Sequence, residues 1–346
     1  MTETPRISVV VPNYNHARFL DRRLASIFAQ TRRDFEVVFL DDASPDDSVA
    51  VARAWAGRHP MRLDLREKNT GNPFAQWNRG VSLARGEFVW IAESDDDAAP
   101  ELLETLVGLL ERDPQVVVAH CQSRIVDAHD TLVDVTARWY ADLDATRWTT
   151  EFTNDGRDEC RRFLCLSNTI PNASATVFRR SAYLAAAPAN EAMRYSGDWL
   201  TWAALLGQGR FAYTPRALNR FRKHGANLTD PSKVDRFLAD WLAIARMIDE
   251  RDKLDAGQRA TLLRRLVRYQ LDAPRADLRP WSNFVAATRI ARRLGPSGLF
   301  PVGSLRRITF WESILLAWPA APLTRLSMTE MIVIRPVRGA TFMPIS

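Results

Sequence analysis

The sequence predicts an α/β fold, in which a mostly parallel sheet carries helices on both faces and a helical region follows. Two observations support this prediction. Through the first 120 residues, short apolar runs alternate with segments of helical periodicity, which is typical of parallel sheets with crossover helices. Beyond residue 231, apolar side chains recur only at helical spacing. We therefore expect a domain at 1–230, with halves at 1–120 and 121–230, and a helical C-terminal region at 231–346.

The first strand is expected at residues 6–11, whose sequence Arg-Ile-Ser-Val-Val-Val is rich in β-branched side chains. Pro12 should end this strand, because proline has no N–H to donate to a neighbouring strand. Asn15 is a suitable residue to cap the helix that follows. That helix is predicted from apolar side chains at helical spacing, namely Phe19, Leu20, Leu24, Ile27 and Phe28.

A second buried strand is expected at 35–40, and it leads into Asp41 and Asp42. Ser44 should cap the next helix, with Pro45 at its first position. The elements that follow are a short strand, a loop, a helix and a buried strand, expected at 61–65, 69–73, 77–84 and 88–92.

Four carboxylates follow the strand at 88–92 within five residues: Glu93, Asp95, Asp96 and Asp97. Charges this dense repel one another, and they need a solvated loop, a cation or a ligand rich in donors. The carboxyl ends of strands in open α/β sheets are where ligands bind. The alternative is a solvated acidic loop that caps the helix starting near Pro100.

The middle of the chain is less regular. Poor periodicity at 129–168 predicts irregular structure and short strands that cover the expected ligand site. Trp139 and Trp148 lie in this segment, and we favour a place in the core for both. The regular elements expected after Pro100 are strands at 116–121, 169–178 and 211–213, a helix within 192–206, and three C-terminal helices marked by apolar residues at 237–248, 262–269 and 284–294.

Composition sets broad limits. Apolar residues make up 46% of the chain, which is enough for a large core. The three cysteines have no zinc-type spacing and suggest reduced core residues in a cytoplasmic protein. We expect no export signal and no membrane span, because no apolar run approaches about 18 residues. The net charge of +6 fits an anionic ligand or a membrane surface, but the dispersed arginines do not indicate a nucleic-acid partner.

A set of motifs occurs in fixed order, at 8–15, 30–31, 40–44, 69–71, 78–80 and 84–88. This set resembles the nucleotide-binding half of the family 2 glycosyltransferases of GT-A fold. The resemblance covers roughly residues 6–115, with weaker agreement to about 230. It implies an inverting enzyme that moves a sugar from a nucleotide-diphosphate donor, with UDP favoured, to an acceptor hydroxyl on a glycan, lipid-linked or other carrier. Surface polysaccharide or glycoconjugate synthesis would be its setting.

The resemblance assigns a nucleotide site to the loops after the first strands. Tyr14 would offer a face to a uracil-like base, and Asp42 an acceptor for its ring N–H. The alternative is that Tyr14 packs on the helix below it and Asp42 only caps the next helix. The further positions assigned to the nucleotide are Pro12, Asn13, Asn15, Asn78, Glu93 and Ser94.

The same resemblance implies a divalent metal, Mn²⁺ or Mg²⁺, since hard cations prefer oxygen ligands and substrate phosphates. Asp95 would be its direct ligand. Glu93 replaces the usual first Asp of the family's Asp-x-Asp motif and would contact ribose or metal-bound water. His224 would bind the metal or the diphosphate, Arg222 would offset phosphate charge, and Asn172 would lie on the acceptor side.

Asp198 stands where the family places the base that deprotonates the acceptor, with Gly197 in place of a preceding acid. An N-cap role for Asp198 is the alternative. The departures at Glu93 and Gly197 leave a catalytically silent nucleotide- or glycan-binding module as a second function. A dinucleotide-dependent oxidoreductase is excluded, because no Gly-x-Gly-x-x-Gly turn follows the first strand.

The apolar C-terminal region carries scattered arginines, as at 305–308. Such segments suit peripheral contact with an anionic membrane at its cytoplasmic face. Packing on the catalytic domain, or on a second subunit in a homo-oligomer, is the alternative.

Overall fold

A ten-stranded mixed sheet runs through the part of the chain that the computed structural model describes, residues 5–186, 189–193, 196–223 and 234–272. The strand order is β3-β2-β1-β4-β9-β6-β10-β5, with β7 beside β6 and β8 beside β10. The strands are β1 Ile7–Asn13, β2 Phe35–Asp41, β3 Arg62–Leu65, β4 Phe88–Ile91, β5 Asp97–Ala98, β6 Val116–Val126, β7 Leu132–Val135, β8 Phe152–Asp155, β9 Thr176–Arg179 and β10 Arg210–Arg222.

The first four strands of the chain, β1 to β4, are parallel and were predicted in the right places. The predicted C-terminal end of β1 was wrong, because this strand continues through Pro12 to Asn13, which pairs with Asp41 of β2. β1 pairs with β4 only as far as Val10. One side of β1 is therefore an open edge at Pro12, where the missing N–H costs nothing.

The second half of the sheet is mixed, because β9 lies antiparallel between β4 and β6, and β10 runs parallel to β6. β10 has 13 residues and is far longer than the strand predicted at 211–213. Its register shifts between Thr214 and Ala217, on either side of Pro215. A proline is tolerated at such an irregularity, but it interrupts the strand pattern in the sequence.

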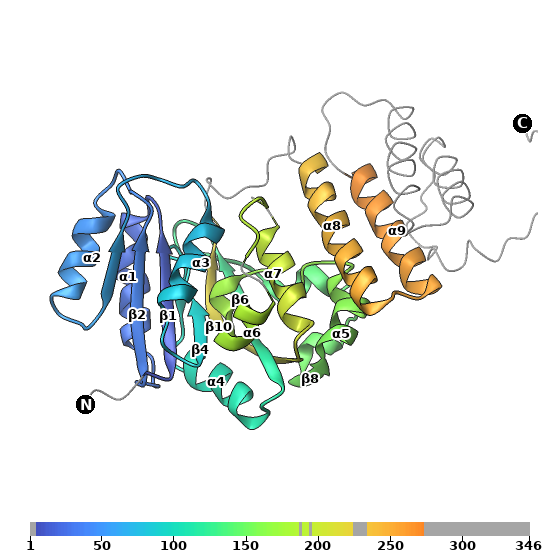
Figure 1. The fold of residues 1–346 in the computed structure, drawn as a ribbon, viewed down its shortest axis with the longest axis horizontal. Coiled ribbons are helices and arrows are strands. Elements are labelled where there is room, and N and C mark those ends of the chain that lie inside the picture. The colour runs from blue at the N-terminus through green and yellow to red at the C-terminus, as the bar shows by residue number, and fades with distance from the viewer. Residues whose placement is uncertain (1–4, 187–188, 194–195, 224–233, 273–346) are drawn as a thin grey trace, which may run out of the picture. The chain divides into compact units, whose positions relative to one another are not determined.

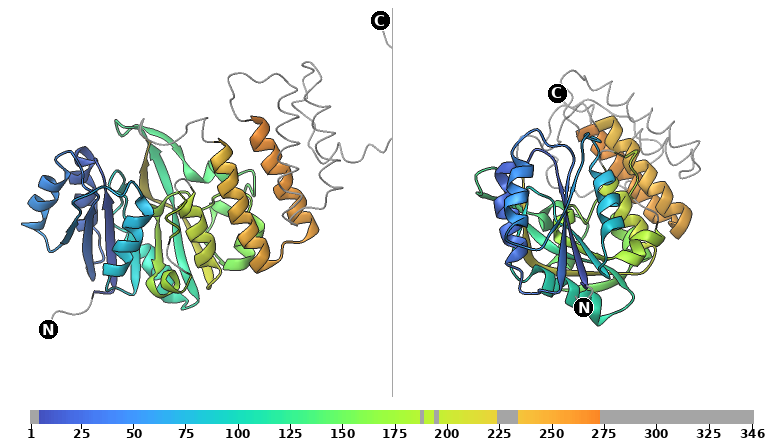
Figure 2. Two further views of the ribbon diagram at one scale, coloured as in Figure 1. Left: turned by 45° about the horizontal axis from the view of Figure 1, so that its top comes forward. Right: turned by 60° about the vertical axis from the view of Figure 1, so that its left-hand side comes forward.

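Helices cover both faces of the sheet, as predicted (Figures 1 and 2). Val9 and Val11 belong to a core shared with α1 and α4, whereas a Cβ on Gly80 of α3 would meet Val10 on the other face. The α-helices of the described residues are α1 Ala17–Phe28, α2 Ser48–Ala56, α3 Pro73–Leu83, α4 Leu102–Arg112, α5 Gly156–Glu159, α6 Arg180–Ala185, α7 Gly197–Leu206, α8 Val234–Asp252 and α9 Ala256–Asp272.

Two predicted helix caps were wrong. His16, and not Asn15, precedes α1, while Asn15 has a φ of 58°. Helix α2 begins at Ser48 instead of Pro45. Ser44 cannot cap it, because its hydroxyl donates to Asp41 Oδ1 at 2.6 Å and accepts from other residues of the strand ends.

Two of the three predicted C-terminal helices are present as α8 and α9, and the third, at 284–294, lies outside the described residues. Residues 1–275 form one unit, so α8 and α9 belong with the sheet. Trp241 of α8 packs on Trp199 of α7, with ring centroids 5.7 Å apart. Trp148 and all three cysteines are buried, as predicted. The same prediction was wrong for Trp139, which is 37% exposed. None of the helices in the described ranges has the length and apolarity to cross a membrane.

Candidate nucleotide and metal site

The loops after β1 and β2 are tied to each other at the carboxyl edge of the sheet. The Asn13 amide donates to Asp41 Oδ1 at 2.8 Å and to Ser44 Oγ at 3.1 Å. The backbone N–H of Asn15 donates to the same hydroxyl at 2.9 Å. Asn15 and Ala43 both have a positive φ, of 58° and 59°. Such strained backbone persists only where the surrounding bonds impose it, and it is frequent at binding sites.

Asp42 lies at the bottom of this loop pair and is 2% exposed. Its Oδ2 accepts two hydrogen bonds from Thr70, from the backbone N–H at 3.0 Å and from the hydroxyl at 2.8 Å. Its Oδ1 is buried without a hydrogen bond among the described residues, and Arg66 Nε comes only within 4.0 Å. A buried carboxylate oxygen without a donor is costly unless a ligand supplies one.

The structure decides against one of the two alternatives. Asp42 does not cap α2, whose N-cap is Asp47. For Tyr14, 44% of the surface is exposed, so part of the side chain is open to a ligand whether or not it also packs on the helix below. An exposed aromatic face and a buried unsatisfied acceptor therefore follow adjacent parallel strands.

The acidic loop after β4 begins with Glu93. Its Oε1 accepts from Trp77 Nε1 at 2.8 Å. Its main chain is held by two other groups, since Arg23 Nε donates to its carbonyl at 2.7 Å and its N–H donates to Ser174 Oγ at 3.0 Å. Burial, reinforced by the charge of Asp95, raises the pKa of Glu93 to about 8. Ser94 Oγ lies 2.8 Å from Nδ1 of His16 and so joins the loop to the start of α1.

Asp96 and Asp97 hold the loop in place. Asp96 Oδ1 accepts from the backbone N–H of Arg222 at 2.8 Å, and its Oδ2 accepts from Asn172 Nδ2 at 2.9 Å. Burial and the Asp95 charge raise the pKa of Asp96 to about 7. Asp97 forms an ion pair with Arg22, with 2.7 Å between Nε and Oδ2.

The donors present fit a hard divalent cation. Asp95 is half-buried, and other carboxylates lie close to it on the same loop. A bound cation would reduce the repulsion between these charges. In the described ranges, no three acidic, histidine or cysteine side chains are arranged to hold a metal by themselves. A cation at Asp95 would therefore complete its coordination with nucleotide phosphates and water. His224 lies outside the described residues.

Asp198 lies in the first turn of α7, and Ser196 occupies the N-cap, so the capping alternative does not hold. Asn168 Nδ2 donates to Asp198 Oδ2 at 3.1 Å. Burial raises the pKa of Asp198 to about 6. Gly197 has a packing reason to lack a side chain, because a Cβ there would lie 2.4 Å from Cε2 of Phe74.

Residues 70–77 connect these parts. Thr70 binds Asp42, Gln76 accepts the backbone N–H of Asn13 at 3.1 Å, and Trp77 donates to Glu93. Phe74 lies against Gly197, the residue before Asp198. The start of α3 therefore brings the ends of β1, β2 and β4 together with the start of α7.

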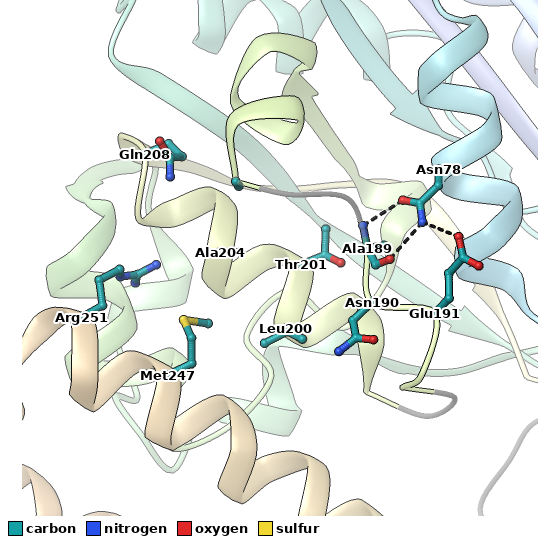
Figure 3. Close-up of a pocket in the computed structure, with 11 residues that line it drawn as sticks. Asn78, Ala189, Asn190, Glu191, Leu200, Thr201, Ala204, Gln208, Met247 and Arg251 are labelled. Carbon is teal, nitrogen blue, oxygen red and sulfur yellow. Dashed lines mark hydrogen bonds between the residues drawn. The ribbon is translucent and has the colours of Figure 1, made fainter.

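Two predicted contacts are not supported by the geometry. The Asn78 side chain donates to Ala189 O and Glu191 Oε1 and accepts from Tyr183 and the Ala189 N–H, all within 2.7–2.9 Å. It therefore holds the 189–191 segment and has no group left for a nucleotide. Asn78 also lines a cavity of about 730 Å³ between this segment, α7 and α8 (Figure 3).

Arg222 is the second such residue. Its side chain is buried, with 2% exposed. Nε donates to the Asp95 carbonyl at 2.9 Å, and Nη1 donates to the Asp127 carbonyl at 3.0 Å. These protein contacts leave the guanidinium poorly placed to offset phosphate charge.

Sequence reasoning missed Arg23 and Ser174. Arg23 is fully buried, donates to Ser174 Oγ at 2.9 Å and lies over the Trp90 ring. The sequence did contain a signal for it. Arg23 falls on the apolar stripe of α1, between Leu20 and Leu24, and a charge on the buried face of a helix indicates a polar partner inside the protein.

The chain belongs to glycosyl transferase family 2, whose model matches residues 8–184. An uncharacterized glycosyltransferase of Nostoc sp. is 35% identical over 130 residues, which are 37% of this chain and 40% of that protein. The chain matches only about two fifths of the length of such curated relatives.

Solved structures share the fold, which is the expected GT-A type. Residues 1–349 of Staphylococcus aureus TarS, in complex with UDP-GlcNAc, are similar with a TM-score of 0.62 at 16% identity, covering 90% of each chain. The mannosyltransferase PcManGT of Pyrobaculum calidifontis, in complex with GDP-Man and Mn²⁺, is similar with a TM-score of 0.54 at 20% identity, covering 91% of this chain and 86% of that one.

Proposed function

We propose that this protein is an inverting glycosyltransferase that moves a sugar from a UDP-linked donor to an acceptor hydroxyl. The observation that carries the proposal is the meeting of four parts at residues 70–77: Asp42, Asn13, Glu93 and the start of α7. In this proposal these parts would form a base pocket, a cation site and a carboxylate base near the carboxyl ends of the strands, which is where open α/β sheets bind ligands.

The base would lie against Tyr14. The unsatisfied Asp42 Oδ1 would accept one hydrogen bond from the base, which suits the ring N–H of uracil. The complex of TarS with UDP-GlcNAc supports a uridine donor, whereas that of PcManGT with GDP-Man makes guanine the competing base.

Asp95 would hold Mn²⁺ or Mg²⁺ together with the donor diphosphate, and Glu93 and Ser94 would contact the ribose or metal-bound water. A cation there, when bound, stabilises the charge of the departing diphosphate. The Mn²⁺ in the PcManGT complex supports this choice of cofactor.

Asp198 would act as the general base. Its carboxylate removes the proton of the acceptor hydroxyl while that oxygen forms a bond to the anomeric carbon, and the bond from this carbon to the diphosphate oxygen breaks. A pKa of about 6 suits this role, since a base works best with a pKa near the working pH. Acceptors that we expect are glycans or lipid-linked carriers, in line with relatives named chondroitin synthase and hyaluronan synthase.

UDP binding tests the base pocket. Calorimetry with the purified chain and MnCl₂ should show tighter binding of UDP than of GDP. Asp42→Asn replaces one acceptor oxygen with a donor, and loss of a hydrogen bond to a charged group should weaken UDP binding by roughly 10- to 100-fold. The control is Asp47→Asn, an exposed position at the start of α2. Equal UDP affinity in Asp42→Asn would show that Asp42 does not bind the base.

A silent nucleotide-binding module remains the second candidate. The bond from Trp77 to Glu93, with the raised pKa of that carboxyl, favours it, because Glu93 is committed to a protein partner. UDP binding without consumption of any UDP-sugar, with or without acceptor glycans, would decide for the module.

A further inference from the structure

The turn between β6 and β7 is a small, internally bonded structure next to the acidic loop. The Asp127 N–H donates to the Thr131 carbonyl at 3.0 Å. Asp127 Oδ1 accepts from the N–H groups of His129 and Thr131 at 2.8 and 2.9 Å. Asp130, at the tip, has a φ of 70°. These bonds fix the carbonyl of Asp127 and the carboxylate of Asp130 in defined positions.

Arg222 joins this turn to the acidic loop. On the turn, its Nη1 donates to the Asp127 carbonyl at 3.0 Å and its Nη2 to Asp130 Oδ1 at 2.6 Å. On the acidic loop, its Nε donates to the Asp95 carbonyl at 2.9 Å and its backbone N–H to Asp96 Oδ1 at 2.8 Å. One buried residue therefore fixes the main chain of Asp95 from one side.

We propose that Arg222 is a positioning residue, which holds the main chain at Asp95 so that its carboxylate can bind a divalent cation together with the donor diphosphate. This inference rests on the proposed function. It replaces the expected role of Arg222 as a phosphate contact, which the burial of its side chain and its four hydrogen bonds to protein make unsuitable.

The geometry requires arginine and not only a positive charge. Three nitrogens of one planar group reach three acceptors on two separate segments. A lysine ammonium is a point charge on a flexible stem and cannot reproduce that fork. A residue that merely neutralised phosphate charge would tolerate the exchange to lysine far better.

Arg220 provides a matched control two residues earlier on β10. It lies 3.8 Å from Asp97 and 3.5 Å from Asp130. Arg222 also contacts these two carboxylates, at 3.7 and 2.6 Å. Within the described residues, the side-chain hydrogen bonds of Arg220 go to Asp130 and not to the main chain of Asp95. Loss of Arg220 therefore disturbs the ion-pair network without releasing the loop.

The experiment compares Arg222→Lys, Arg222→Gln, Arg220→Lys and wild type, using the full-length chain. Mn²⁺ affinity is measured by electron paramagnetic resonance with saturating UDP, and UDP affinity by calorimetry in EDTA. We expect both Arg222 variants to bind Mn²⁺ about tenfold more weakly, with UDP affinity in EDTA within twofold of wild type and Arg220→Lys unchanged. A normal Mn²⁺ affinity in Arg222→Lys, with weaker Mn²⁺ or UDP binding only in Arg222→Gln, would overturn the proposal in favour of a charge contact.

A second measurement needs no ligand. Amide hydrogen exchange of residues 93–97 should become at least tenfold faster in Arg222→Lys and stay unchanged in Arg220→Lys. Asp130→Asn, at the surface of the turn, should give a smaller change of the same kind if the Arg222 variants fold poorly. Unchanged exchange in all variants would overturn the inference. Failure of wild-type protein to bind Mn²⁺ and UDP would instead count against the proposed function.

Discussion

Replacing Asp198 by Asn should strongly slow transfer and at the same time stabilise the fold. Asn is nearly isosteric and keeps an oxygen to accept the hydrogen bond from Asn168. It loses the charge that burial disfavours. The pKa of Asp198 is raised from 3.8 to about 6, mainly by burial, so the folded protein resists its ionisation.

The size of the effect follows from this pKa. A difference of about 2 units corresponds to about 3 kcal/mol at most, at 1.36 kcal/mol per unit. The side chain is only half-buried, and solvent screening reduces our expectation to about 1–2 kcal/mol. Between pH 4 and 6 the folded state binds this proton more tightly than the unfolded state does. The wild type therefore loses stability relative to Asp198→Asn as the pH rises through this window, and the deficit persists above about pH 6.

Urea unfolding at pH 4 and pH 8 measures the difference. Asp198→Asn should match wild type at pH 4 and exceed its free energy of unfolding at pH 8. Asp46→Asn is a control of opposite sign, since hydrogen bonds from Ser48 and Ala17 lower the pKa of Asp46 despite its partial burial. Donor turnover should fall roughly 10²- to 10⁴-fold, as expected for loss of a general base.

Two outcomes would refute this reasoning. If Asp198→Asn keeps transfer within tenfold of wild type, Asp198 is not the base. If its free energy of unfolding at pH 8 does not exceed that of wild type, burial of the ionised carboxylate carries no cost in the folded protein.

Two further variants test packing and loop assignments. Gly197→Ala should lower the free energy of unfolding by about 1–3 kcal/mol, because the new methyl group overlaps the Phe74 ring. In the double variant Gly197→Ala/Phe74→Leu, the loss of this free energy should be smaller than the sum of the losses in the two single variants. Strictly additive losses would contradict the proposed overlap. Asn78→Ala should lower the same free energy by about 1–3 kcal/mol, because it removes the acceptor of the Tyr183 hydroxyl and the donor to the Ala189 carbonyl. Calorimetry on Asn78→Ala should give an unchanged UDP affinity, and a tenfold loss would restore Asn78 to the nucleotide site.

The sequence was sufficient for the parallel half of the sheet. Runs such as Val9 to Val11 are buried on both faces and therefore consist of continuous apolar residues. The length of β10 was underestimated because a proline and a register shift interrupt the alternating pattern of this strand in the sequence. The pairing of β9 between β4 and β6 joins segments far apart in the chain, which local periodicity cannot indicate.

The sequence predicted which residue types follow the strands at the candidate site, but it did not predict the hydrogen-bond partners of those side chains. Asn78 and Arg222 were assigned to the nucleotide by motif position, yet their polar groups are used by the 189–191 segment and by the β6–β7 turn. Both partners come from distant parts of the chain. A motif gives the position of a side chain in the sequence, whereas its availability depends on which groups the fold brings within about 3 Å of it.

Hydrogen bonding separates the polar groups at the sheet edge into two kinds. Asp41 and Asp96 have each carboxylate oxygen bonded to a protein donor, so they maintain the loops. Asp42 and Asn13 each retain one buried oxygen without such a donor among the described residues. Since an unsatisfied buried acceptor destabilises a fold, its presence at the ends of two adjacent strands is best explained by a ligand that donates there. The sites of these two oxygens are therefore where a bound UDP should be sought first.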